Sequence, residues 1–198
     1  EKSVQPKTFE YYGQYHGLII YKTKLTGHKS GKLIITDLHD FATVFLNGRY
    51  IGSIDRRLGE NSLQLPATQE AFPTLEIRVE SMGRINYGQQ LIDRKGITDR
   101  VTLNGMTLMN WDIFRFPLED EWIRNLTPGI ADTASKGLFF KGNFPLDHCA
   151  DTYNDLKNYT KGVVWINGHN LGRFWNIGPQ YKFYCPASWL KTGLNEIV

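Results

Sequence analysis

One nine-residue pattern occurs twice in this sequence, and it restricts the possible folds more than any other feature. Residues 44–52 read VFLNGRYIG and residues 164–172 read VWINGHNLG, so the two copies lie 120 residues apart. Each copy begins with β-branched or aromatic residues, which favour a strand. Each continues with Asn-Gly, a pair that tolerates the positive φ angles of a tight hairpin turn. The pattern therefore predicts two β-hairpins.

The two copies stay aligned beyond the hairpins. At the same spacing, residues 17–20 match residues 137–140, and residues 76–77 match residues 196–197. An alignment this long indicates one β module that has been duplicated, rather than a solenoid built from many short units.

The strand in the second copy is apolar on both of its faces. Val164 and Ile166 point to one side of such a strand, and Val163 and Trp165 point to the other. We therefore expect cover on both sides. The core of the module would supply one cover, and a neighbouring domain or a ligand would supply the other.

Short extended segments with turn residues between them follow one another along the whole chain, as in an antiparallel β-sandwich. The predicted domains are a linker or lead-in at 1–12, a first sandwich at 13–110 and a second sandwich at 111–198. The segment 111–118 is predicted to be a strand that opens the second sandwich or crosses between the two. The predicted strands are 17–24, 32–36, 42–46, 62–65, 74–80, 111–118, 138–141, 152–156, 163–166, 182–185 and 194–198, with another Asn-Gly hairpin at 101–108, a weak helix at 120–126 and a loop at 127–136.

Composition excludes several classes of function. The net charge of +3 is small and the basic residues are scattered, which argues against a nucleic-acid partner. No apolar run approaches the ~20 residues of a membrane span. Cys149 and Cys185 form no metal-ligand spacing, so we expect free thiols and no metal. The chain begins with Glu1 rather than Met, which favours a piece of something longer.

No set of residues in the sequence indicates a catalytic centre. Paired carboxylates could hydrolyse a glycoside, but the acidic residues stand in no such setting and are expected to be solvated charges. A serine-nucleophile motif is absent, and the five histidines are dispersed. We therefore predict no catalytic residue and no cofactor. The acidic residues considered are Asp93, Asp112, Glu119, Glu121 and Glu196.

Sugar recognition is chemically available, because aromatic rings can stack on the apolar face of a pyranose while polar groups bond its hydroxyls. Trp175 and Tyr181 are candidate rings, and Asn170 and Arg173 are candidate polar partners. The alternative, that these rings pack the module or a domain interface, is favoured by the matched positions of Phe45 and Trp165. Buried indole and phenol groups still need hydrogen-bond partners.

The loop after the strand 74–80 is the best candidate for a functional contact. Gly83 and Gly88 bracket it and permit unusual backbone angles. Between them, Arg84, Asn86 and Tyr87 offer donors, acceptors and a ring. Loops on a rigid scaffold often carry function. In the alternative interpretation, Arg84 braces the loop and Tyr87 packs.

Three segments resemble the C-terminal region of the β-galactosidases of glycoside hydrolase family 35. They are residues 79–88 (VESMGRINYG), 93–98 (DRKGIT) and 161–180 (KGVVWINGHNLGRFWNIGPQ). The resemblance implies two tandem galactose-binding-like jelly-roll β-sandwiches, an all-β fold. In that family a catalytic (β/α)8 barrel precedes them and carries the two glutamates of a retaining mechanism. Nothing in this sequence resembles the barrel, so no catalytic residue is carried over.

The resemblance also implies roles for the glycine-bracketed loop. Tyr87 would line the sugar pocket of the barrel, and Arg84 and Asn86 would hold the loop. The implied partners are the barrel of the same parent chain and a β-galactoside, and the implied location is periplasmic, secreted or lysosomal. The expected function is therefore that of an accessory fragment of an exo-acting β-galactosidase. An independent carbohydrate-binding module and a purely structural scaffold remain the alternatives.

Overall fold

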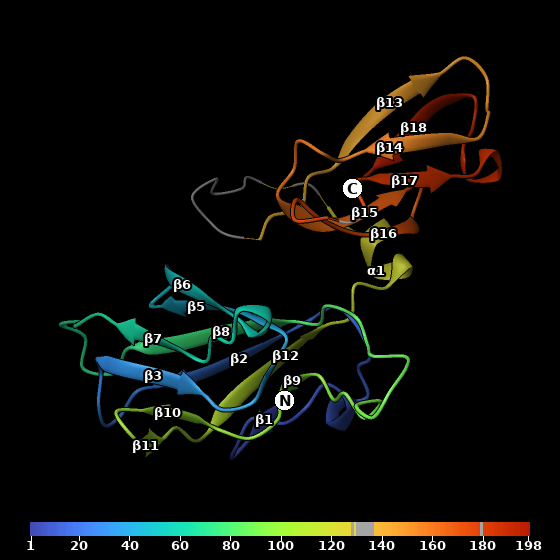
Figure 1. The fold of residues 1–198 in the computed structure, drawn as a ribbon. Coiled ribbons are helices and arrows are strands. Elements are labelled where there is room, and N and C mark those ends of the chain that lie inside the picture. Colours follow the sequence, from blue (N-terminus) through green and yellow to red (C-terminus); the bar gives the residue numbers. More distant parts are fainter. Residues whose placement is uncertain (128, 130–136, 179) are drawn as a thin grey trace. The chain divides into compact units, whose positions relative to one another are not determined.

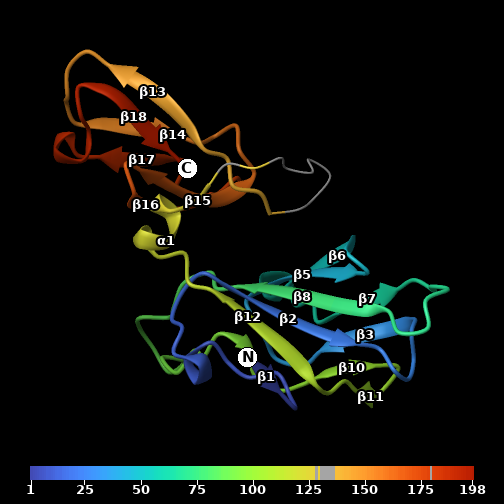
Figure 2. The same cartoon turned by 180° about the vertical axis from the view of Figure 1, so that it is seen from behind.

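The computed structural model describes the whole chain apart from residues 128, 130–136 and 179. The chain divides into two compact units, Glu1–Leu118 and Glu119–Val198. Both are built almost entirely from antiparallel strands, which confirms the all-β prediction (Figures 1 and 2). In the part of the chain that the structure describes, no helix has the length and apolar character needed to cross a membrane.

The first unit contains two larger sheets and one small sheet. The strand orders are β1-β12-β2-β8-β5-β6, β11-β10-β3-β7 and β4-β9. Two short 3-10 helices, Glu10–Tyr12 and Arg56–Leu58, lie between strands. The strands are β1 Lys2–Ser3, β2 Leu18–Lys24, β3 Gly31–Ile35, β4 Leu38–His39, β5 Phe41–Leu46, β6 Arg49–Asp55, β7 Ser62–Leu65, β8 Thr74–Glu80, β9 Gly96–Ile97, β10 Val101–Leu103, β11 Met106–Thr107 and β12 Trp111–Phe116.

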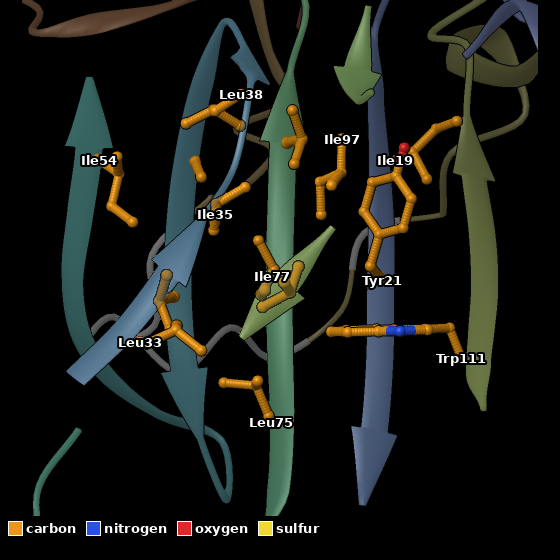
Figure 3. Packing of buried hydrophobic residues seen from close by; sticks show 14 of the residues in the cluster. Ile19, Tyr21, Leu33, Ile35, Leu38, Ile54, Leu75, Ile77, Ile97 and Trp111 are labelled. Atoms are coloured by element: carbon orange, nitrogen blue, oxygen red, sulfur yellow. The ribbon is translucent and has the colours of Figure 1, made fainter. Parts of the chain in front are cut away.

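The core of the first unit lies between its two larger sheets. In β8, Leu75, Ile77 and Val79 are fully buried while the residues between them are less so, because successive side chains of a strand point to opposite faces. Figure 3 shows such side chains from β2, β8 and β12 gathered with those of β3 in one cluster. The hydroxyl of the buried Tyr21 in this cluster donates to the Lys7 carbonyl at 2.7 Å.

The segments at the two ends of the first unit differ from the sequence prediction. The predicted linker at 1–12 packs onto the unit, because β1 pairs with β12 and Phe9 is fully buried. The strand predicted at 111–118 forms β12, which pairs with β2 from Asp112 to Phe116. It therefore lies in a sheet of the first unit, and the second unit begins at Glu119 rather than at residue 111.

The second unit is a smaller sandwich. Its sheets have the orders β13-β18-β15-β16 and β14-β17, and Leu156, Val164, Phe174 and Phe183 form its buried core. A short helix, α1, precedes the strands, within the predicted 120–126 segment. The elements are α1 Asp120–Arg124, β13 Gly142–Leu146, β14 Thr152–Asp155, β15 Lys161–Ile166, β16 His169–Trp175, β17 Lys182–Cys185, a 3-10 helix Ala187–Trp189 and β18 Gly193–Ile197. The loop predicted at 127–136 lies largely outside the described residues.

The strand order confirms that the two units share a module. The order β2-β8-β5-β6 in the first unit matches β13-β18-β15-β16 in the second. Both predicted hairpins form, and Asn47 and Asn167 adopt φ of 51° and 49° in their turns. Each hairpin also changes register at the same place, between Val44 and Phe45 and between Val164 and Trp165.

The repeat departs from a constant spacing at two places. The strand predicted at 138–141 is absent, and β13 begins at Gly142 instead. On the returning strand, Leu46 pairs with Leu75, whereas Ile166 pairs with Ile197. Ile197 is therefore the structural counterpart of Leu75 and not of Ile77. A change of two residues keeps the same side chains facing the core.

Candidate functional site

The glycine-bracketed loop extends from the end of β8 toward β9. Gly83 and Gly88 adopt φ of 107° and 95°, in the left-handed half of backbone space that favours glycine. The side chain of Tyr87 is 89% exposed, so its ring projects from the loop. Leu91 and Ile92 of the same loop are also exposed. The loop therefore presents a ring and apolar groups to the outside.

Arg84 anchors this loop to the segment before β2. Its guanidinium donates to the Asp93 carbonyl at 3.1 Å and to the Tyr15 carbonyl at 3.0 Å, and it pairs with the Glu10 carboxylate at 2.6 Å. Partial burial alone would raise the pKa of Glu10. Hydrogen bonds from its own backbone, Arg84 and the Lys95 backbone outweigh that effect and lower it. Arg84 thus links the start of the loop to its end at Asp93 and to the segment before β2.

A buried ionic cluster lies beneath the base of the loop; we call it the Lys95 cluster. It consists of His39, Asp40, Arg56, Asp93 and Lys95. The Lys95 ammonium, 2% exposed, lies 2.8 Å from Asp40 and 2.5 Å from Asp93. The Arg56 guanidinium lies 3.0 Å and 3.2 Å from the same two carboxylates. Two buried anions are therefore matched by two cations.

The cluster holds both ends of the loop. Asp40 accepts a hydrogen bond from the Met82 backbone N–H at 2.8 Å, just after β8. Asp93, at the other end, is bonded by Lys95, Arg56 and His39 Nδ1. Burial would raise the pKa of Asp93, but the hydrogen bonds from Lys95 and His39 hold it well below its usual range. Asp93 is thus a buried anion, and the prediction of a solvated charge was wrong for it.

The spacing of His39, Asp40 and Asp93 alone would suit a metal ion, because one ligand atom from each lies within 4.8 Å of the others. The ammonium of Lys95 and the guanidinium of Arg56 already bond both carboxylates, however. Side-chain cations thus occupy the position that a metal would need. We conclude that the cluster is an internal support for the loop.

Asn170, Arg173 and Trp175, the other predicted sugar contacts, lie on one face of β16. They pair directly with Trp165, Val163 and Lys161 of β15, and directly paired residues of an antiparallel ladder share a face. Two cations lie over the Trp175 ring, with the Arg173 guanidinium 4.9 Å and the Lys161 ammonium 5.2 Å from its centroid.

Tyr181 lies apart from this strand face. Its hydroxyl donates to the Asn176 carbonyl at 3.2 Å, and its own carbonyl accepts from the Leu156 N–H at 2.8 Å. It also lines a surface depression together with Asp155 and Gln180. The structure therefore brings three of the four predicted sugar contacts onto β16 and places Tyr181 at a different feature of the same unit.

The outer face of the duplicated strand is covered, but not by what the sequence suggested. The Trp165 ring is 2% exposed, and its indole N–H donates to Asp120 of α1 at 3.2 Å. Arg124 of α1 donates to the Gly168 carbonyl at 3.2 Å. A helix of the same unit thus covers Trp165, where we expected a neighbouring domain or a ligand.

Sequence reasoning missed most of the Lys95 cluster. Its members come from three segments, namely β4 with the residue after it, the 3-10 helix after β6 and residues 93–95 before β9, and these segments meet only in the fold. One signal was present, since Asp93 and Lys95 flank Arg94 immediately before the buried Gly96 and Ile97. Charges placed next to a buried strand are candidates for an internal ion pair.

Comparison with known proteins identifies both units. A family model for the first all-β domain of β-galactosidase matches residues 6–119, and a model for the galactose-binding domain of β-galactosidase matches residues 137–195. The chain is 40% identical to a β-galactosidase of Xanthomonas manihotis over 188 residues, which is 92% of this chain. It is 36% identical to the Bos taurus β-galactosidase over 222 aligned positions that cover all of it.

A third relative is the β-galactosidase-1-like protein 2 of Homo sapiens, 34% identical over 94% of this chain. The chain spans only 29% to 34% of the lengths of these three relatives. Because one family model alone matches more than half of its residues, the chain belongs to the β-galactosidase family, and it corresponds there to the first all-β domain followed by the galactose-binding domain.

Proposed function

We propose that this chain is a non-catalytic accessory part of an exo-acting β-galactosidase. In that role it braces the catalytic barrel and helps to shape the galactose pocket through the loop that carries Tyr87. One observation carries the proposal: a strongly exposed ring stands on a loop whose base is fixed by a buried ionic cluster. Fixing the base of the loop lowers the entropy lost when a partner or substrate orders the loop.

The geometry supports two different roles for residues of the loop, attachment and ligand contact. Arg84 and the Lys95 cluster hold its base, while Tyr87 projects with its ring and hydroxyl available. A phenol combines a flat apolar face with one donor and acceptor group, which suits contact with a sugar. Asn86 lies beside Tyr87, where its amide could bond the same ligand.

The catalytic groups and the rest of the pocket come from outside this chain. Its relatives are about three times as long, which leaves room for the (β/α)8 barrel that the family resemblance implies. The substrate of the whole enzyme is accordingly a terminal β-galactoside. No residue of this chain is assigned a role in bond cleavage, and no cofactor is invoked.

Substitution of Tyr87 in the full-length enzyme tests the proposal. Tyr87→Ala should lower kcat/KM for an aryl β-galactoside by about 10–100-fold, mainly through KM, because a ground-state contact is lost. Tyr87→Phe would separate the contribution of the ring from that of the hydroxyl. Phe72→Ala is a matched control, since Phe72 is also exposed and lies outside the loop. Unchanged kinetics for Tyr87→Ala would favour a pure scaffold.

A second experiment addresses catalysis by the isolated 198-residue chain. We expect no turnover of an aryl β-galactoside above the buffer rate, since no acid–base pair is assigned. Turnover that a single carboxylate substitution abolishes would contradict the accessory role.

A further inference from the structure

The small sheet of the second unit turns an aromatic face outward. In β17 the residues alternate, with Phe183 and Cys185 buried and Lys182 and Tyr184 exposed. Tyr184 pairs directly with Tyr153 of β14, and Lys182 pairs with Asp155. Directly paired residues share a face. Tyr153 and Tyr184 are 65% and 48% exposed, so two rings and the Lys182–Asp155 pair form the outer face of β14–β17.

The two rings are held in place although they are exposed. Their centroids lie 5.7 Å apart at an interplanar angle of 62°, a favourable edge-to-face contact. The Asp151 carboxylate beside the Tyr184 hydroxyl raises the pKa of Tyr184. Asp151 itself accepts the Ala187 backbone N–H at 2.8 Å. The Tyr184 ring is therefore held by a neighbouring ring, and its hydroxyl lies beside an anchored carboxylate.

A shallow depression of about 430 Å³ adjoins this face. It is lined by Asp155, Lys157, Gln180, Tyr181 and Lys182, so Asp155 and Lys182 belong to both features. A third ring, Tyr181, is 37% exposed here and is held by its hydrogen bond to the Asn176 carbonyl. The Asp155 carboxylate lies 3.9 Å from each of the Lys157 and Lys182 ammonium groups, too far for a strong hydrogen bond. These polar groups retain capacity for a ligand.

We propose that the outer face of β14–β17 and the adjoining depression form a binding surface for a neutral carbohydrate. A pyranose ring would stack on the more exposed Tyr153, which Tyr184 supports edge to face at 62°, and its hydroxyls would bond Asp155, Lys182 and Gln180. The carboxylates of Asp151 and Asp155 balance the ammonium groups of Lys157 and Lys182, so this surface carries no net charge, which favours a neutral ligand over a polyanion. Fixed rings support binding, because little side-chain freedom remains to be lost.

This surface differs from the one that the sequence suggested. The outer face of β16 offers Trp175, but two cations already lie over that ring. The surface is also separate from the Tyr87 loop, which belongs to the first unit. The inference therefore does not depend on the proposed role of Tyr87, and the two proposals fail in different experiments.

Titration of the 198-residue chain with methyl β-galactopyranoside and with a β-linked galacto-oligosaccharide, followed by calorimetry and NMR shifts, tests the proposal. We expect measurable binding to at least one of these sugars. Tyr153→Ala and Tyr184→Ala should each weaken it by about tenfold or more, which corresponds to the loss of one stacking ring. Tyr153→Phe should keep most of the affinity, because it keeps the ring.

Trp175→Ala and Phe72→Ala, the latter at an exposed ring of the first unit, are the matched controls, and both should bind as the unmodified chain does. Unfolding temperatures of all variants would establish that the second unit remains folded. Three results would overturn the proposal: no binding of either sugar at millimolar concentration, binding that Trp175→Ala abolishes while Tyr153→Ala does not, or binding of the polyanion heparin only.

Discussion

The two units contain the same four-stranded arrangement but cover the outer face of the duplicated strand differently. In the first unit, the Arg78 guanidinium lies 4.1 Å from the centroid of the Phe45 ring, and Tyr50 contacts its edge. In the second, α1 covers Trp165 and accepts its indole proton. The first cover comes from within the repeated sheet, and the second from a segment before it. The two copies thus kept the same strand order, whereas the groups that cover Phe45 and Trp165 differ.

The units also differ in how they satisfy buried polar groups. The first uses the charged Lys95 cluster. The second uses neutral amides, since the fully buried Asn195 accepts from Asn167 at 2.8 Å and donates to the Lys191 carbonyl at 2.7 Å. Charged and neutral networks respond differently to the loss of one member and to pH. Each comparison can be tested by substitution.

Lys95→Met should have the largest effect on stability. It leaves Asp40 and Asp93 buried with one cation fewer, and breaking a buried ion pair in this way costs about 3–5 kcal/mol. Chemical unfolding should show this loss in the first unit and not in the second. Lys24→Met, at an exposed lysine, is the control. A loss below about 1 kcal/mol would mean that Arg56 alone neutralises the two carboxylates.

Asn195→Ala should have a smaller effect, confined to the second unit. It leaves the Asn167 amide and the Lys191 backbone N–H without their acceptor, at a cost of about 1–3 kcal/mol. Because every group involved is neutral, the loss should be equal at pH 5 and pH 7. The exposed Asn158→Ala serves as the control. A loss that varies with pH would remove the contrast with the Lys95 cluster.

Asp120→Ala tests the cover of Trp165. The indole N–H loses its acceptor, so we expect the second unit to be destabilised by about 1 kcal/mol, with a change in Trp fluorescence on the folded protein. Asp147→Ala, at an exposed position, should leave both readings unchanged. Equal effects from the two substitutions would show that the hydrogen bond to α1 adds nothing to the packing of the ring.

The pH dependence of the Lys95 cluster is the smallest expected effect. The pKa of Asp93 in the folded chain lies below its unfolded value of about 3.8, so its stabilisation is present above that value and is lost as pH falls through the folded pKa. The stability difference between the unmodified chain and Asp93→Asn should therefore stay constant from pH 7 to pH 5. It should shrink only below about pH 4. A decline already at pH 6 would contradict the lowered pKa of Asp93.

Local patterns in the sequence predicted the strands well. The β-branched run and Asn-Gly of each copy produced hairpins with the expected positive φ angles, and the alternation in β8 placed Leu75, Ile77 and Val79 in the core. Such features depend on residues within a few positions of one another. They could be inferred because the side-chain period of a strand is visible in a short window.

The sequence-based predictions were wrong where segments distant in the chain meet. They were also wrong where the two-residue side-chain period of a strand allows more than one register. Residues 196–197 match residues 76–77 in the sequence, yet the ladder aligns Ile197 with Leu75, because a strand resembles itself after two residues. Similarly, the burial of Asp93 depends on His39 and Arg56, which lie far from it in the chain. The sequence indicated a short helix at 120–126, but it did not indicate that this helix packs over Trp165.

The attachment of the loop at its two ends has a consequence for how such a protein can diversify. Asp40 holds Met82, while Arg84 and the cations of the Lys95 cluster hold Asp93, so the attachment of the loop does not involve the exposed residues 86–92. We therefore expect substitutions within 86–92 to affect the stability of the sandwich less than substitutions of Arg84 or Asp93. In a scaffold of this kind, the residues that attach the loop are constrained by folding, whereas the exposed residues of the loop can evolve toward a new ligand.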